Sequence, residues 1–213
     1  MPTPPTTTHL LYLHGFRSSP QSVKARLMAE RVRRDHPALI WYCPQLPPSP
    51  RAAMTLVLEA VAGWPRASMA VIGSSLGGFY ATWVAEQTGC KAVLLNPAVN
   101  PARDLANHIG VQSSWHDPQE RFFFRPEFVQ ELRELVPATL TQLDRYLAVI
   151  AKGDELLDWR EMQARYAGAH QHLLDGSDHG LTDFEQHLPV ILSFLGLGLG
   201  LALPPVNPSR QGA

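Results

Sequence analysis

Short apolar runs alternate with longer amphipathic segments along most of the chain. Six segments are predicted to be strands, at residues 9–13, 38–43, 68–72, 91–95, 146–151 and 169–174; His170 and His172 alternate along the last of them. Five segments carry apolar side chains at helical spacing, at residues 20–35, 51–63, 76–87, 157–166 and 181–195. Strands that are apolar almost throughout and alternate with helices indicate a parallel sheet covered on both faces.

The start of the first helix is signalled by Ser19 and Pro20. Serine is favoured at the position that caps a helix N-terminus, and proline is favoured at the first helical position. The sequence therefore predicts Ser19 as the N-cap of this helix.

Residues 98–145 interrupt the alternation. This segment is long and carries no clear strand, although a charged helix is predicted from Pro126 to Leu135. It also holds five aromatic side chains, at Trp115, Phe122, Phe123, Phe124 and Phe128. Because this exceeds what a connection needs, the segment is predicted to be a lid over a pocket. The alternative is an ordinary excursion whose aromatic side chains pack into the core.

The length of 213 residues fits one domain, residues 1–213, with 98–145 as its insertion and 200–213 as a flexible tail. The net charge of −1 and the absence of a basic stripe argue against a nucleic-acid partner. No apolar run approaches the roughly 20 residues of a membrane span. The first residues lack the features of a signal peptide, so the cytoplasm is the expected location. Cys43 and Cys90 are expected to be reduced.

A candidate nucleophile lies in the stretch GSSLGG, residues 73–78. Its first five residues read Gly-x-Ser-x-Gly, with Ser75 in the middle. A strand is predicted before this pattern and a helix after it, as a nucleophile elbow requires. The turn is so tight that the nucleophile is strained and bulky neighbours would clash. Ser75 is therefore predicted to be the nucleophile, at the carboxyl end of the sheet.

A serine hydroxyl is a poor nucleophile until a base takes its proton. His179 follows the last predicted strand on a glycine-flanked loop, residues 175–180, and can reach the sheet edge that carries Ser75. His108 and His116, both in the insertion, are weaker candidates. His179 is therefore predicted to be the general base.

An imidazole base needs a carboxylate to fix its tautomer and stabilise its cation. Asp154 follows the fifth predicted strand, again at the carboxyl edge of the sheet. Asp158 is the second candidate, and the alternative for Asp154 is a turn or N-cap aspartate. The order Ser75, Asp154, His179 is the chain order of the α/β-hydrolase triad.

A serine hydrolase also needs an oxyanion hole. The main-chain N–H groups of Phe16, after the first strand, and Leu76, after the nucleophile, are the predicted donors. The alternative for residues 14–16 is a plain turn that ends the strand. A metal site is not predicted, because His170 and His172 have no third ligand at a usual spacing. No phosphate-binding or dinucleotide motif is present either, so no cofactor is expected.

The chain resembles the YqiA-like esterases, a bacterial family of small α/β-hydrolases. The resemblance rests on residues 12–20, 73–83, 96–99, 153–158 and 178–180. It implies an α/β-hydrolase fold and esterase activity on acyl esters, with acyl-CoA thioesters as a second substrate class. It also implies that Ser75, Asp154 and His179 form the triad.

The residues thus predict a serine hydrolase that cleaves carboxylic esters of small molecules through an acyl-enzyme. Two other hypotheses remain at this point. An acyl-CoA thioesterase would use the same triad, and a hydrolase-fold binding protein would have no turnover.

Overall fold

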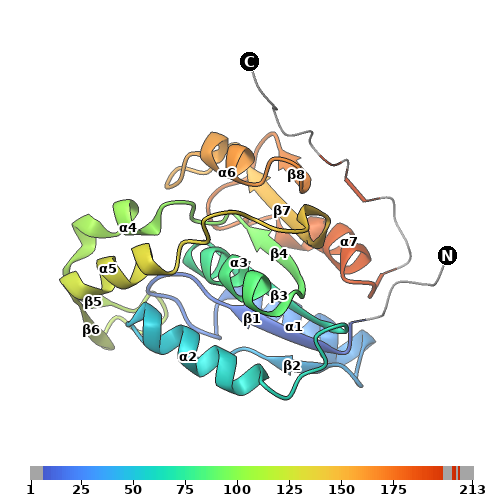
Figure 1. Ribbon diagram of the computed structural model, residues 1–213, viewed down its shortest axis with the longest axis horizontal. Helices are drawn as coiled ribbons and strands as arrows, with labels where there is room; N and C mark the ends of the chain where they lie inside the picture. The colour runs from blue at the N-terminus through green and yellow to red at the C-terminus, as the bar shows by residue number, and fades with distance from the viewer. Residues whose placement is uncertain (1–6, 199–202, 205, 207–213) are drawn as a thin grey trace.

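The computed structural model describes residues 7–198, 203, 204 and 206. A six-stranded sheet forms the centre of the molecule (Figure 1). The strand order is β2-β1-β3-β4-β7-β8, and every pair within this sheet is parallel. Its strands are β1 (His9–Leu13), β2 (Ile40–Tyr42), β3 (Met69–Ser74), β4 (Lys91–Leu95), β7 (Tyr146–Ala151) and β8 (His170–Leu174). All six predicted strands are therefore confirmed.

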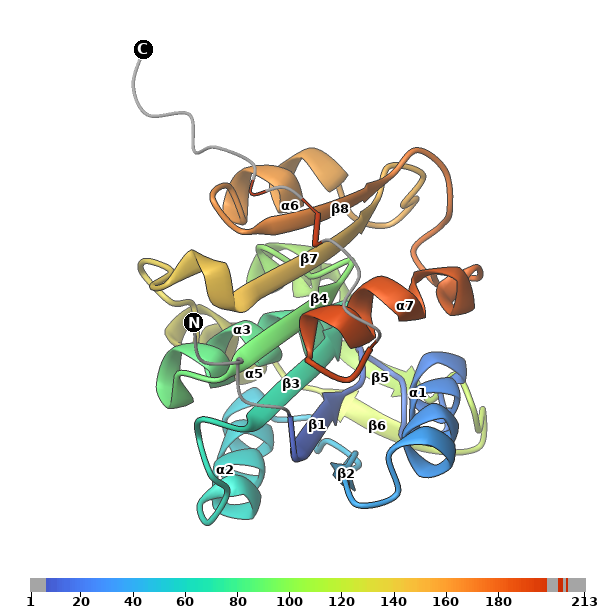
Figure 2. The same ribbon diagram turned by 90° about the vertical axis from the view of Figure 1, so that its right-hand side faces the viewer.

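Helices cover both faces of this sheet, which explains why the strands are apolar almost throughout (Figure 2). On one face lie α1 (Val23–Asp35) and α7 (Phe184–Phe194). On the other lie α2 (Pro50–Val61), α3 (Leu76–Thr88) and α6 (Trp159–Arg165). Strands β3 and β7 are buried at every residue because helices pack against both of their faces.

The first helix begins later than the sequence predicts. Its N-cap is Ser22 and its first residue is Val23, so the prediction of Ser19 as the N-cap is wrong. The Ser19 hydroxyl accepts a hydrogen bond from the Gln21 N–H at 3.1 Å, and the Ser19 carbonyl accepts one from the Ser22 N–H at 3.0 Å. Ser19 thus closes a turn that precedes the helix, which is another common use of serine.

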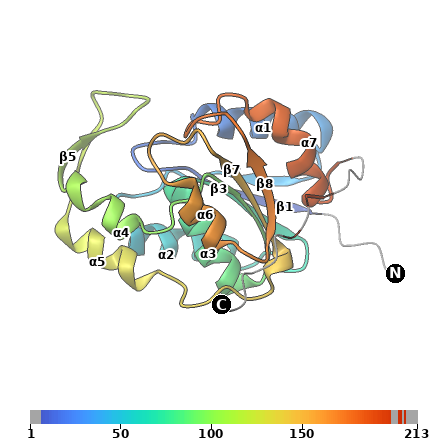
Figure 3. The same ribbon diagram turned by 90° about the horizontal axis from the view of Figure 1, so that it is seen from above.

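The insertion, residues 98–145, extends to one side of the sheet (Figure 3). The sequence analysis found no clear strand in it, and this expectation is wrong, because β5 and β6 pair as an antiparallel hairpin. The predicted charged helix is confirmed as α5. The elements of the insertion are α4 (Pro101–Asp104), two 3₁₀ helices at Ala106–His108 and Leu143–Arg145, β5 (Gly110–Ser113), β6 (Arg121–Phe124) and α5 (Pro126–Glu134).

One face of this hairpin packs against the loop that follows β1. The ring of Phe16 lies 5.9 Å from that of Phe122 and 5.2 Å from that of Phe124, centroid to centroid, with edge-to-face geometry. On the opposite face, Val111 and Phe123 form a cross-strand pair and are exposed. The insertion thus shapes the surroundings of the β1 loop, while its motion as a lid stays a prediction.

Three further expectations concern the cysteines, membrane-spanning helices and the C-terminal tail. Cys43 and Cys90 are free thiols. Within the described part of the chain, no helix is both long and apolar enough to cross a bilayer. Most of the tail predicted at 200–213 lies outside the described residues, but Val206 forms an antiparallel bridge with His170 of β8.

Candidate active site

Ser75 occupies the sharp turn between β3 and α3. Its backbone is left-handed, with φ 57° and ψ −120°, which is a strained conformation for a residue with a side chain. The Ser75 N–H donates to the Leu95 carbonyl at 2.9 Å, and the Ser75 carbonyl accepts from the Ala98 N–H at 3.0 Å. These bonds to the end of β4 and the segment beyond it hold the turn in its strained shape.

The two glycines around Ser75 are required by close backbone packing. A Cβ on Gly73 would lie 2.0 Å from the Gly77 carbonyl oxygen, and a Cβ on Gly77 would lie 2.0 Å from the Leu13 carbonyl oxygen. No side chain fits at such distances. The Gly-x-Ser-x-Gly pattern therefore lets α3 start directly against β1 and β3, and the strand–turn–helix context predicted from the sequence is confirmed.

His179 connects Ser75 to a buried carboxylate. Its Nε2 lies 3.0 Å from Ser75 Oγ, and its Nδ1 lies 2.8 Å from Asp154 Oδ2. An ionised carboxylate can only accept, so Nδ1 carries the proton and Nε2 is left free to accept from the serine hydroxyl. The side chain of Asp154 is fully buried, whereas that of His179 is 17% exposed. The structure thus brings the three predicted residues together in one line.

The second oxygen of Asp154 is also satisfied. Oδ1 accepts the N–H groups of Leu156 at 2.9 Å and Leu157 at 2.8 Å, so this aspartate caps the turn after β7 as well as bonding His179. Asp158, the second candidate, is the N-cap of α6 and accepts from the Arg160 N–H at 2.9 Å. The carboxylate that contacts the imidazole is therefore that of Asp154.

Gly153 allows the turn after β7 to approach the loop after β8, which carries His179. A Cβ at this position would lie 2.2 Å from the Ser177 carbonyl oxygen, in the loop that carries His179. The missing side chain allows the turn after β7 to touch the turn after β8. The backbone N–H of His179 also donates to Glu155 Oε2 at 3.0 Å, which adds a second link between the loops.

The predicted oxyanion donors lie next to Ser75. Leu76 is the first residue of α3, so its N–H has no partner within the helix. Phe16 follows Gly15, and a Cβ on Gly15 would lie 3.3 Å from the Ser75 Cβ and 3.8 Å from Ser75 Oγ. The loop after β1 therefore runs directly past the serine side chain, as this role needs.

His14 holds that loop in place, a role that the sequence analysis did not assign. It is buried, and its Nε2 accepts from the Leu46 N–H at 3.0 Å while its Nδ1 lies 3.0 Å from the Gly15 carbonyl oxygen. Burial lowers the pKa of His14, which favours the neutral ring that this pair of bonds requires. His14 thus ties the loop after β1 to the loop after β2.

Asn96 is the second residue whose role the sequence analysis missed, although it opens one of the motifs of the family resemblance. It is fully buried at the end of β4, with a positive φ of 42°. Its side-chain oxygen accepts from the Ala151 N–H at 2.8 Å. Its amide nitrogen donates to the carbonyls of Asp178 at 2.9 Å and His179 at 3.3 Å. Asn96 therefore anchors the histidine loop to the centre of the sheet.

Replacing Asn96 with aspartate should impair the site without removing any member of the triad. The carboxylate still accepts from Ala151 but cannot donate to the two carbonyls. If the predicted triad acts on an ester, we expect kcat to fall by about tenfold or more, with little change in KM. Stability should fall by about 3–5 kcal/mol, because an unpaired buried charge replaces the amide. Steady-state kinetics and urea unfolding measure the two effects.

Asn100→Asp is the matched control. The side chain of Asn100 caps α4 by accepting from the Arg103 N–H at 3.3 Å, and aspartate can make the same bond. This variant should keep both kcat and stability. Wild-type kcat in Asn96→Asp would contradict a positioning role for Asn96.

Among the described residues, no histidine other than His179 forms a hydrogen bond with the Ser75 side chain. The ring of His108 packs edge-on against Phe16 at 5.6 Å between centroids, and the His116 N–H bonds Ser114. His170 Nδ1 lies 2.9 Å from the Pro204 carbonyl oxygen, so this ring nitrogen already has a hydrogen-bond partner. Among the residues that the structure describes, no group of three or more His, Cys, Asp or Glu side chains is arranged to hold a metal ion.

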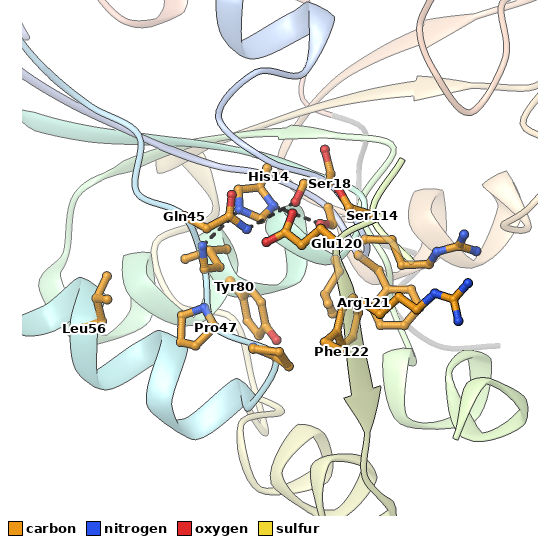
Figure 4. A pocket seen from close by; sticks show the side chains of 16 residues that line it. His14, Ser18, Gln45, Pro47, Leu56, Tyr80, Ser114, Glu120, Arg121 and Phe122 are labelled. Carbon is orange, nitrogen blue, oxygen red and sulfur yellow. Dashed lines mark hydrogen bonds between the residues drawn. The ribbon is translucent and has the colours of Figure 1, made fainter. Parts of the chain in front are cut away.

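Two cavities meet at the loop after β1, and residues 14–18 line both. The first, the Ser75 cavity, has a volume of about 530 Å³ and is lined by Ser75 and His179. The second, the Leu76 cavity, has a volume of about 360 Å³. Figure 4 shows side chains that line it, including those of Tyr80 and Phe122. Most of the Leu76 cavity is apolar, with walls that include Leu46, Leu56, Leu76, Tyr80 and Phe122. The candidate nucleophile thus lines one of the two cavities, and its neighbour Leu76 lines the other.

Comparison with known proteins decides the family. The model of UPF0227, described as an uncharacterised protein family, matches residues 9–196. The chain belongs to UPF0227. A UPF0227 protein of Yersinia enterocolitica, YE1706, is 25% identical over 195 residues, which cover 89% of this chain and 99% of that protein. A UPF0227 protein of Yersinia pseudotuberculosis, YpsIP31758_1593, is 26% identical over 196 residues, with the same coverage of 89% and 99%. The family resemblance is confirmed.

Solved structures show the fold of this UPF0227 chain. A structure of the metagenome-derived lipolytic enzymes LipS and LipT is 18% identical, with a TM-score of 0.65 and coverage of 90% of this chain and 94% of that one. Est1E from Butyrivibrio proteoclasticus is 14% identical, with a TM-score of 0.62 and coverage of 91% and 87%. At such identities the likeness establishes the fold alone. The chain has the α/β-hydrolase fold, as predicted.

Proposed function

We propose that this protein is a serine hydrolase that cleaves carboxylic esters through an acyl-enzyme. The observation that carries the proposal is the hydrogen-bonded line from Ser75 Oγ through His179 to Asp154. Such a line is what a serine needs to become a nucleophile. The lipolytic enzymes LipS and LipT share the fold, which supports a hydrolase as the general class.

Acylation begins when Ser75 Oγ attacks the carbonyl carbon of the ester. His179 Nε2 takes the hydroxyl proton, and the buried carboxylate of Asp154 stabilises the resulting imidazolium. The N–H groups of Leu76 and Phe16 stabilise the oxyanion. Two such donors lower the barrier by several kcal/mol, at about 2.7–4 kcal/mol each. The tetrahedral intermediate then collapses, and His179 returns the proton to the leaving alcohol.

Deacylation repeats these steps with water in place of the serine. His179 removes a proton from the water, whose oxygen attacks the acyl carbon. The second tetrahedral intermediate releases the carboxylic acid and restores the Ser75 hydroxyl. The strained backbone of Ser75 is present before substrate arrives, so the nucleophile needs no rearrangement to react.

The two cavities suit the two halves of an ester. The Leu76 cavity is apolar, while the Ser75 cavity holds the nucleophile and the base. An ester carbonyl between Ser75 Oγ and the Leu76 N–H would lie next to both cavities, because each of these residues lines one of them.

The proposal is tested by active-site labelling. A fluorophosphonate probe should react with the folded protein, and mass spectrometry of the digest should find the adduct on Ser75. Prior incubation with a p-nitrophenyl ester should slow the labelling. A folded protein that resists the probe and does not turn over p-nitrophenyl esters would favour a hydrolase-fold binding protein instead.

Ester and thioester substrates require separate measurement, because the same triad cleaves both bonds. Butyrate esters and butyryl thioesters with matched leaving groups should be compared by kcat/KM. We expect the ester to be the better substrate under this proposal. A clear preference for the thioester would assign the protein as a thioesterase that uses the same residues.

A further inference from the structure

Two cations line the Ser75 cavity without a carboxylate partner. They are Arg17, in the loop after β1, and Lys24, in the first turn of α1. Neither side chain lies within ion-pair distance of a carboxylate among the described residues, although six other Lys or Arg side chains form such pairs at their own sites. Lys24 Nζ donates to the Gly180 carbonyl oxygen, which leaves two of its three N–H donors for other acceptors.

The carboxylates nearby each have at least one other partner. Asp104, which also lines the cavity, is paired with Arg103 through Oδ1 at 2.8 Å, while its Oδ2 is buried and has no hydrogen-bond partner among the described residues. Asp154 bonds His179 and two backbone N–H groups, and Asp178 bonds the N–H and hydroxyl of Thr182, both at 3.0 Å. Burial lowers the pKa of Lys24, while the charges of Asp178 and Asp154 oppose that shift. An anion beside the ammonium would stabilise its charged form further.

A buried phenol gives an independent indication of a polar ligand in this cavity. Tyr12 lies in β1 and also lines the Ser75 cavity, and its side chain is fully buried. Burial raises the pKa of the Tyr12 phenol, and the nearby Ser22 side chain opposes that shift. The two side chains nevertheless form no hydrogen bond, and the Tyr12 hydroxyl has no partner among the described residues. Buried hydroxyl groups without a partner are uncommon in folded proteins.

The guanidinium of Arg17 is partly restrained. Its Nε donates to the Ser113 carbonyl at 2.7 Å, and its Cζ lies 4.2 Å from the centre of the Trp115 ring. Both contacts tie Arg17 to the β5–β6 hairpin. Its Nη2 also donates to the Ser113 hydroxyl at 3.3 Å, so the planar guanidinium is held in one orientation at the cavity wall.

From these observations we propose that the Ser75 cavity contains an anion subsite, formed by Lys24 with Arg17 and the Tyr12 hydroxyl. The ligand is a carboxylate or phosphate group carried by the ester substrate itself. This inference rests on the proposed function and specifies its substrate class as esters with a negative charge on one side of the scissile bond.

The test compares anionic esters with neutral esters of similar structure. The alcohol-side set contains the butyryl ester of p-hydroxybenzoate, the butyryl ester of p-hydroxyphenyl phosphate and the neutral butyryl ester of methyl p-hydroxybenzoate. The acyl-side pair is the mono-p-nitrophenyl ester of adipic acid and the neutral p-nitrophenyl hexanoate. We expect the anionic ester to be preferred by about tenfold in kcat/KM on one side, which identifies the part of the substrate that meets Lys24.

Lys24→Met should remove this preference, because it keeps the length of the side chain and removes the charge. Lys24→Arg should retain most of it. Added salt should weaken the preference in the wild type, since screening acts on charge and not on packing. Lys91→Met is the matched control, because Lys91 also donates to a backbone carbonyl, that of Phe194 at 2.9 Å, but lies at the amino end of β4.

Two results would overturn the subsite. One is equal kcat/KM for charged and neutral esters on both sides of the bond. The other is a loss in Lys24→Met that affects charged and neutral esters equally, because that would mean Lys24 only positions Gly180. Loss of neutral-ester hydrolysis in Ser75→Ala tests the proposed function separately, so failure of the subsite leaves that assignment intact.

Discussion

Replacing Ser75 with alanine is expected to reduce kcat for a p-nitrophenyl ester by about four to six orders of magnitude. The change removes the only atom that can bond to the acyl carbon in the proposed mechanism, and residual rate would come from the oxyanion donors and binding alone. Alanine is smaller than serine and should not disturb packing at the turn. Progress curves at high enzyme concentration, with background hydrolysis subtracted, measure the loss.

Ser74→Ala is the matched control for this variant. Ser74 precedes the nucleophile in the chain and lines the same cavity, but the base contacts Ser75. Its replacement should lower kcat by less than tenfold. If Ser75→Ala kept more than about one per cent of the wild-type kcat while Ser74→Ala lost most of it, the nucleophile would be Ser74 and the proposed mechanism would be wrong.

The sequence predicts this site well because each of its parts follows a strand. In a parallel sheet the carboxyl ends of the strands meet at one edge, so Ser75, Asp154 and His179 needed only their strands to be recognised. Apolar runs of six residues indicated the strands before Ser75 and Asp154 directly, since helices bury both faces of β3 and β7. The strand before His179, β8, is less apolar and reads His-Gln-His-Leu-Leu. The Gly-x-Ser-x-Gly pattern then indicated the candidate nucleophile, because close backbone contacts at Gly73 and Gly77 leave no room for a side chain.

The supporting residues could not be predicted in the same way. Asn96 and His14 act through backbone groups of other loops, and those distances depend on the assembled sheet. A polar residue directly after a buried strand was the available signal for both. Asn96 carried a further one, because asparagine tolerates the positive φ that it adopts here.

The hairpin in the insertion was missed for a different reason. Strands β5 and β6 have four residues each, and only one of their faces is covered. Phe122 and Phe124 face inward, whereas Phe123 points outward and is 54% exposed. Three consecutive phenylalanines hide the alternation that identifies a half-buried strand. The part of the cavity lining that this hairpin supplies could therefore not be predicted from the sequence.

Replacing Asp154 with asparagine is expected to lower kcat by about 10⁴-fold without loss of the fold. The amide oxygen can still accept from Leu156 and Leu157, so the turn after β7 should be kept. The amide nitrogen, however, would donate to Nδ1 of His179. The imidazole proton then moves to Nε2, which faces Ser75 and can no longer accept the hydroxyl proton.

Asp158→Asn separates this effect from a general change in charge. Both aspartates lie in the same six-residue segment, and asparagine caps a helix as well as aspartate does, so the N-cap of α6 should survive. We expect kcat within about twofold of wild type for Asp158→Asn, and circular dichroism spectra that match for all three proteins. If Asp154→Asn instead kept its kcat while Asp158→Asn lost it, the carboxylate of Asp158 would have to reach His179 during turnover. In that case the bond from His179 to Asp154 would serve only to hold the loop.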